Sequence, residues 1–135
     1  WGDLKYNTVV WIPSIETFIG SDVIFSQAHP FTCEVSAKGR AKWIEDIEKF
    51  ENLGAEIVIP GHVKHGEPFD ERSFTFTKEY LKATERKLAE TTDMKEFFYD
   101  MCMEFPDAQL IFLSNEMNSS VFLGGRDWNW SDMGD

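Results

Sequence analysis

An aspartate and three histidines are the residues of this sequence that could hold a metal ion. Asp22 precedes one short apolar run, His62 follows another, and His29 and His65 lie in polar segments between and after them. Carboxylate and imidazole groups bind divalent metals such as zinc, whose bound water becomes a nucleophile near neutral pH. Each residue also fits a simpler role, because aspartate often ends a strand and histidine beside proline or glycine often lies in a solvated loop.

The two cysteines, Cys33 and Cys102, lie far apart in the chain and outside any C-x-x-C spacing. Neither has a nearby histidine and acid that would activate a thiolate, so we interpret both as inert or partly buried thiols. Two isolated cysteines seldom form a disulfide framework, which favours a reducing, cytoplasmic location. We therefore propose no nucleophilic residue.

Composition limits the kinds of partner. The chain has 135 residues, of which 42% are hydrophobic, and a formal net charge of −11. This length favours one domain, and the acidic balance works against binding to the phosphates of nucleic acid. No apolar stretch approaches the length of a membrane span, so we expect no membrane partner. We predict one domain over residues 1–125 and a tail over residues 126–135.

Short apolar segments predict the strands. Leu4 to Ile12 is rich in β-branched and aromatic residues and stops at a Pro-Ser pair, which predicts a strand and a turn. We expect Thr17 to Ile19 to be its hairpin partner. The runs Asp22 to Phe25 and Ile57 to Ile59 predict buried strands. The aspartate should then lie at the rim of the sheet, and His62 just beyond a strand end.

Apolar residues at helical spacing predict the helices. These helices run from Arg40 to Leu53, from Asp70 or Ser73 to about Leu88, from Met94 to Phe105 behind a cap at Thr92 or Asp93, and from Leu110 to Leu123. We expect the aromatic and methionine residues of the last two helices to pack as core: Phe97, Phe98, Met101, Met103, Phe105, Phe112 and Met117. The first helix, between two buried strands, suggests a βαβ-like unit.

Three segments in this order resemble the C-terminal half of a metallo-β-lactamase-fold domain, of the metallohydrolase superfamily. They are the strand that ends at Pro13, the run Asp22-Val23-Ile24-Phe25, and Ile57-Val58-Ile59-Pro60-Gly61-His62. In the family these segments resemble "vvyiPe…lftGDvvf" and "vviPGH", with a tryptophan-bearing helix between them, as Trp43 is here. The resemblance covers roughly residues 1 to 90. Ser21 replaces the family's glycine before the aspartate, a small-for-small change that still allows the turn.

The resemblance implies an α+β fold: half of the family's αβ/βα sandwich, a mixed β-sheet with helices on one face, here with extra C-terminal helices. It also implies that Asp22 is a metal-binding carboxylate and His62 the last imidazole ligand. The H-x-H-x-D-H signature that supplies the family's other ligands does not occur in this sequence. A catalytic zinc site needs three protein ligands, so His29 is a candidate third ligand, or it faces a substrate.

Three functions fit these observations. The first is a truncated or vestigial metallo-β-lactamase-fold protein that self-associates and is not catalytic alone, without stoichiometric zinc. The second is the C-terminal part of an active zinc-dependent hydrolase that another segment or chain completes. The third is a small-molecule or protein-binding module that uses the old cleft. Family members act on varied substrates with similar C-terminal halves, so the sequence names no substrate.

Continuous hydrophobicity in the strands predicts a homodimer. Strands that are apolar on both faces need cover on both, and the chain's own helices cover one. A two-fold axis is the commonest way for one surface to complete itself. The tail carries Trp128 and Trp130 with no visible core partner. Two interpretations stand equally: an interaction element, or a disordered tail.

Overall fold

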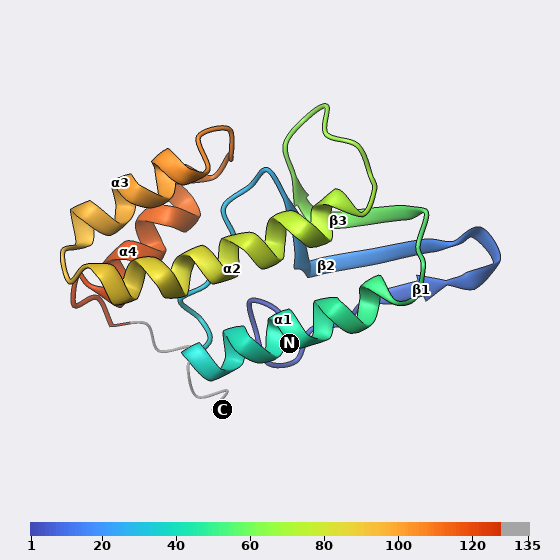
Figure 1. The fold of residues 1–135 in the computed structure, drawn as a ribbon, viewed down its shortest axis with the longest axis horizontal. Coiled ribbons are helices and arrows are strands. Elements are labelled where there is room, and N and C mark those ends of the chain that lie inside the picture. Colours follow the sequence, from blue (N-terminus) through green and yellow to red (C-terminus); the bar gives the residue numbers. More distant parts are fainter. Residues whose placement is uncertain (128–135) are drawn as a thin grey trace.

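The computed structural model describes residues 1–127, and in this part of the chain it combines one three-stranded mixed sheet with four α-helices (Figure 1). In the sheet, β1 (Val10–Ile12) pairs antiparallel and β3 (Ile57–Val63) pairs parallel with the central β2 (Thr17–Ser26). The helices are α1 (Ala37–Glu51), α2 (Arg72–Glu90), α3 (Met94–Glu104) and α4 (Glu116–Phe122). The predicted α+β class is confirmed. None of the helices within residues 1–127 is both long enough and apolar enough to cross a membrane.

The predicted βαβ-like unit is also confirmed, because α1 connects the parallel strands β2 and β3. Side-chain caps fix where the helices begin. The Ser36 hydroxyl accepts a hydrogen bond from the Gly39 N–H at 3.1 Å, so α1 begins earlier than the predicted Arg40. The predicted cap at Asp93 is present, and its carboxylate accepts from the N–H groups of Lys95 and Glu96 at 2.8 and 3.0 Å.

The first predicted strand, Leu4 to Ile12, is shorter in the structure, where only Val10–Ile12 pairs as β1. The Asn7 side-chain amide explains this difference. It donates to the Leu4 carbonyl and to the Asp3 carboxylate, both at 3.0 Å. Such local bonds to the backbone offer the chain an alternative to a sheet ladder, and residues 3–6 bend instead of extending.

A bulge in β2 corrects the predicted positions of both metal-ligand candidates. The two segments predicted as separate strands form the single strand Thr17–Ser26, and its register against β3 shifts on both sides of Ser21. Ser21 has a φ of 47°, the left-handed conformation that extra residues of bulges adopt. Asp22 therefore lies inside a strand and not at the rim of the sheet. His62 also lies inside a strand, since β3 continues to Val63.

The Pro-Gly-His segment of β3 has a structural explanation at this bulge. A Cβ atom on Gly61 would lie 2.4 Å from the Ser21 carbonyl oxygen, which is closer than any real contact. Glycine is therefore required for the backbones of β2 and β3 to approach each other here. This close approach positions the residue that follows, His62, against β2.

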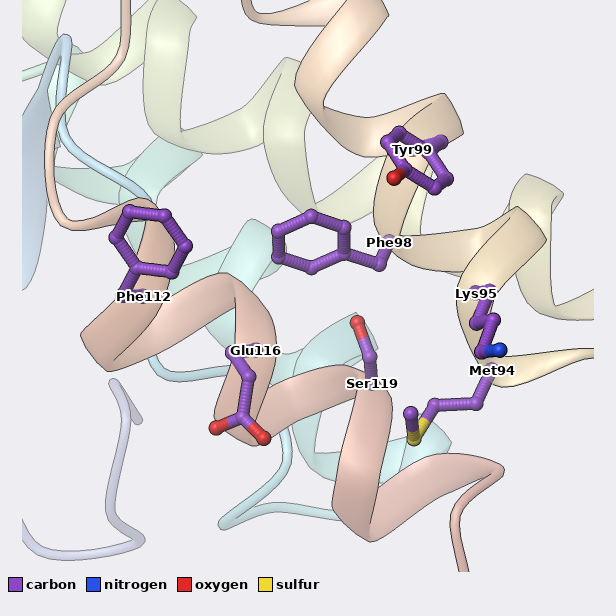
Figure 2. A pocket seen from close by; sticks show the side chains of 7 residues that line it. All are labelled: Met94, Lys95, Phe98, Tyr99, Phe112, Glu116 and Ser119. Atoms are coloured by element: carbon purple, nitrogen blue, oxygen red, sulfur yellow. The ribbon is translucent and has the colours of Figure 1, made fainter.

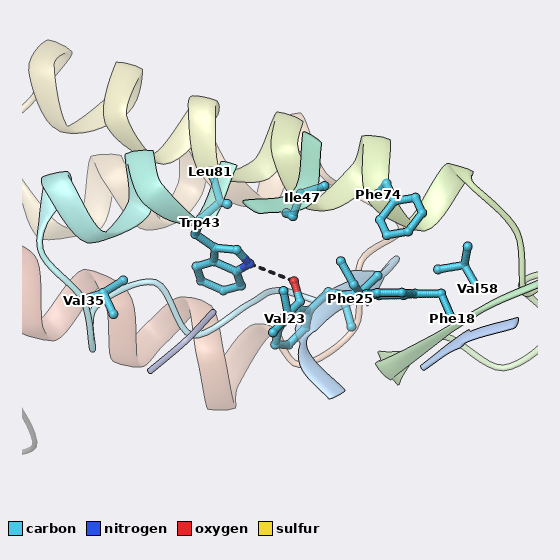
Figure 3. Packing of buried hydrophobic residues seen from close by; sticks show 11 residues of the cluster. Phe18, Val23, Phe25, Val35, Trp43, Ile47, Val58, Phe74 and Leu81 are labelled. Carbon is cyan, nitrogen blue, oxygen red and sulfur yellow. Dashed lines mark hydrogen bonds between the residues drawn. The ribbon is translucent and has the colours of Figure 1, made fainter. Parts of the chain in front are cut away.

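Helices α1 and α2 pack on one face of the sheet (Figure 3). Phe18 of β2 contacts the rings of Phe50 and Phe74 at centroid distances of 5.0 and 5.4 Å. The Trp43 indole is fully buried and donates to the Val23 carbonyl at 2.8 Å. The buried core on this side also includes Ile24, Phe25, Ile47, Val58 and Leu81.

The other face of the sheet carries aliphatic side chains that these helices do not cover. Side chains alternate along a strand, so the residues beside Phe18 and Val58 point away from the helices. We call this surface the open sheet face; its members, from the pairing register, are Val10, Ile12, Ile19, Ile57 and Ile59. Val10, Ile19 and Ile57 are 46%, 36% and 43% exposed. The sheet is thus apolar on both faces and covered on one.

A second core cluster joins α2 to α3 and consists of Tyr80, Ala83, Phe97 and Met101. The last predicted helix is divided: a π-helical segment η2 (Ile111–Asn115) precedes α4. The expectation that all the C-terminal aromatic and methionine residues are core is wrong for Met103 and Phe112, which are 78% and 84% exposed. At Phe112, the wide π-helical turn breaks the 3.6-residue spacing on which that expectation rested. Met103 lies in the regular helix α3, two positions after the buried Met101, so it points to another side of the helix.

The loop between β2 and α1 is held by buried polar groups of α4 and α1. The Asn118 side chain of α4 accepts from the N–H groups of Thr32 and Cys33 at 2.9 and 3.1 Å and donates to the Pro30 carbonyl at 2.8 Å. The buried guanidinium of Arg40 donates to the Thr32 carbonyl at 2.9 Å. These bonds tie α4 to the part of the chain that follows the sheet's central strand.

Thr77 of α2 makes the polar contact that joins helix and strand. Its hydroxyl accepts from the buried Phe25 N–H at 2.9 Å and lies 3.0 Å from the Phe25 carbonyl. We predict that Thr77→Val lowers the free energy of unfolding by about 2 kcal/mol, because it leaves that N–H without a partner.

Thr84→Val is the matched control for this prediction. Thr84 is also buried in α2, but its hydroxyl bonds only to the Tyr80 carbonyl of its own helix, at 3.0 Å. Its replacement should cost less than about 1 kcal/mol. Urea denaturation measures both changes. Equal losses for the two variants would show that the contact between helix and strand adds no stability beyond that of a hydroxyl bonded within its own helix.

Candidate functional site

Asp22 and His62 lie side by side on the two parallel strands. The His62 Nε2 atom is 3.1 Å from the Asp22 Oδ1 atom, and the two side chains are 42% and 44% exposed. The His62 imidazole stacks on the buried Phe25 ring, with centroids 5.1 Å apart and planes at 19°. The ring contact and the adjacent bulge together fix the imidazole so that one nitrogen faces the carboxylate. The two candidate ligands are therefore brought together, as the family resemblance implies.

Asp3 is a third polar residue at this place, and the sequence analysis did not select it. Its N–H donates to the Asp22 carbonyl at 3.3 Å, and its carboxylate accepts from Asn7. Burial, together with the neighbouring charge of Asp22, raises the pKa of Asp3 to about 6. No local pattern marks Asp3, because its place beside Asp22 depends on a contact between distant residues.

His29 occupies a different environment from the one predicted for a metal ligand or a substrate contact. Its side chain is fully buried, and its Nδ1 lies 2.8 Å from the Tyr80 hydroxyl. The other ring nitrogen, Nε2, has no hydrogen-bond partner among the described residues. Reaching a metal or a substrate would require this side chain to leave its buried site.

The residues present do not fit a zinc site within one chain. Within residues 1–127, no group of three or more His, Cys, Asp or Glu side chains is arranged to hold a metal ion. Asp22 and His62 make a pair, His29 does not join it, and His65 lies exposed beyond β3. A catalytic zinc normally needs three protein ligands, and the Asp22–His62 pair offers two.

The remaining candidate residues are the two cysteines and the two tryptophans of the tail. Cys33 and Cys102 are both free, and burial raises the pKa of the Cys33 thiol to about 12, so this thiol is protonated at neutral pH. The predicted interaction residues Trp128 and Trp130 lie outside the described residues. The suggestion that they form an interaction element stays a prediction.

Comparisons with known proteins do not assign the chain to a family. No protein-family model matches the sequence, and a search of curated proteins finds no matching sequence. The resemblance to the metallo-β-lactamase fold therefore depends on the segments that carry Asp22 and His62 and on their order in the chain.

The burial of His29 gives a testable pH dependence. Burial lowers the pKa of His29 from 6.5 to about 4, so the folded chain keeps the imidazole neutral. The unfolded chain then binds more protons than the folded chain between these two values. The contribution of His29 to stability is complete above the unfolded value of 6.5, and we predict that it falls by up to about 3 kcal/mol as the pH decreases toward 4.

Urea denaturation of the wild type and of His29→Gln, at about pH 7 and about pH 5, measures this contribution as a difference. The variant should lose less stability on acidification than the wild type. Asp3→Asn is the opposing control, because a carboxyl whose folded pKa is raised stabilises the folded chain as the pH falls. Removing Asp3 should therefore make the acid loss steeper. Identical acid losses for the wild type and His29→Gln would contradict a buried neutral imidazole.

Proposed function

We propose that this chain is a metallo-β-lactamase-like half-domain that is not catalytic alone and that self-associates through its open sheet face. The observation that carries this proposal is the one-sided cover of the sheet. Helices α1 and α2 pack against Phe18 and Val58, whereas Val10, Ile19 and Ile57 on the opposite side stay more than one-third exposed.

The energetics of apolar burial favour association of this face. Covering several hundred square ångströms of apolar surface at roughly 25 cal/mol per Å² contributes on the order of 10 kcal/mol. This is comparable to the whole stability of a small domain. The open sheet face is therefore a strong candidate for an obligate contact.

A second copy is the occupant that we propose for the face. A two-fold axis lets one surface complete itself, with each residue contacting its counterpart region on the partner. The metallo-β-lactamase sandwich packs two similar halves face to face, so a pair of these chains would imitate the complete domain. The 3.1 Å contact between Asp22 and His62 supports the resemblance, which implies that both residues are metal ligands.

Charge gives the proposed association a characteristic salt dependence. Each chain has a formal net charge of −11, so two copies repel each other at low ionic strength. Added salt screens this repulsion and strengthens the apolar contact. The dimer should therefore persist or tighten as the salt concentration rises. The free cysteines Cys33 and Cys102 support a cytoplasmic location for it.

In the alternative function, the open sheet face is again covered, but by a different partner. In that case the chain is the C-terminal part of a zinc-dependent hydrolase, and another segment or chain covers the open sheet face and supplies the missing ligands. The specific observation in its favour is the Asp22–His62 pair, which is exposed enough to accept further ligands from a partner. A chain that stays monomeric until such a partner is added would favour this alternative over self-association.

We predict that the wild type elutes at twice the chain mass of 15.6 kDa and that Ile19→Lys and Ile57→Lys each shift it toward the monomer. A lysine on the open sheet face puts a charge into the apolar contact, which costs several kcal/mol when it has no partner. Gel filtration coupled to light scattering, at low and moderate salt, measures the mass.

Met103→Lys is the control, because Met103 is an exposed apolar residue on α3, away from the sheet. It should leave the mass unchanged. Circular dichroism of all three variants checks that each is folded. A monodisperse wild-type monomer at tens of micromolar, or lysine variants that remain dimeric, would refute self-association through this face.

A further inference from the structure

A pocket between α3 and the segment η2–α4 is separate from both the open sheet face and the Asp22–His62 pair (Figure 2). Its volume is about 320 Å³, which is within the range of small-molecule sites. Figure 2 shows the Phe98 ring at its centre, with Phe112 on one side and Tyr99 and Met94 on the other. Aromatic and thioether groups thus form most of the wall.

Within residues 1–127, other side chains leave much of the aromatic wall exposed. Phe112 is 84% exposed and Tyr99 is 65% exposed, although both are large apolar side chains that would gain from burial. The π-helical segment η2 carries Phe112, and the residue before it, Leu110, has a φ of 66°. Short π-helical segments and strained residues of this kind are frequent at functional sites. A flat aromatic group could cover these rings.

Two polar groups of the pocket, on Glu116 and Ser119, have partners within the chain. The Glu116 carboxylate accepts from the Ser120 hydroxyl at 2.8 Å and lies 3.9 Å from the Arg126 guanidinium. The Ser119 hydroxyl donates to the Asn115 carbonyl at 2.7 Å. Within residues 1–127, Lys95 has no ion pair within 4.0 Å, whereas most other cationic side chains of this acidic chain are paired.

We propose that this pocket binds a small aromatic monocarboxylate. The aromatic body would lie against Phe98 and Phe112, and the carboxylate would pair with the Lys95 ammonium group. A single negative charge fits better than two, because Glu116 and the formal net charge of −11 both repel further anionic charge. This site is independent of the proposed function, since it uses neither the open sheet face nor Asp22.

Naphthoate and its neutral analogue naphthylmethanol test the proposal by titration of the isotope-labelled chain, followed by amide chemical shifts. Naphthoate should bind about fivefold more tightly than the alcohol, and it should shift residues of α3 and α4. Lys95→Met should lower the affinity for naphthoate to that for the alcohol, and it should leave the affinity for the alcohol unchanged. Phe112→Ala, an exposed position, should weaken both probes by about fivefold without unfolding the chain.

Lys38→Met is the matched control, because Lys38 is an exposed lysine of α1 outside the pocket lining. It should change neither affinity. Equal affinities for the two probes, naphthoate binding that survives Lys95→Met, shifts confined to the open sheet face, or no binding at millimolar probe would overturn the assignment. Shifts at Phe112 caused by protein dilution alone would assign the pocket to a second copy of the chain and would overturn it too.

Discussion

Helical cover on one face of an apolar sheet is the constraint on which the rest of this structure depends. The central strand β2 is apolar on both sides of its plane, with Phe18 toward the helices and Ile19 away from them. Helices α1 and α2 satisfy the first side with tightly packed aromatic rings (Figure 3). Helix α3 packs on α2 and α4 packs on α3, beyond the end of the sheet, so they leave the second side open (Figure 1).

The bulge in β2 connects this architecture to its chemistry. Without the bulge, the register that pairs Thr17 with Ile57 would set Asp22 directly opposite His62, whereas the shifted register pairs His62 with Phe25. The left-handed Ser21 and the bare backbone at Gly61 let β2 and β3 approach closely, and the carboxylate and imidazole meet at 3.1 Å. Local backbone cost of this kind is typical of sites under functional constraint. Under the proposed function, this cost belongs to a metal-binding site that one chain does not complete.

Features encoded by local periodicity could be predicted from the sequence, whereas those set by distant contacts could not. Helix α3 and its Asp93 cap follow from neighbouring residues, as does the β2–α1–β3 unit. The bulge that places Asp22 inside a strand depends on register with β3, which no local pattern encodes. Burial of His29 depends on Tyr80, far along the chain, and the exposure of Phe112 depends on a π-helical turn that its spacing conceals.

The face-to-face pairing of two chains is tested most directly by isotope-filtered NOE measurements on an equimolar mixture of labelled and unlabelled chains. Only contacts between different copies give signals in that experiment. Pairing through the open sheet face predicts intermolecular NOEs among its methyl groups, those of Val10, Ile19 and Ile57. A self-associated sample whose intermolecular NOEs arise only from α3 and η2, with none from these three residues, would contradict it.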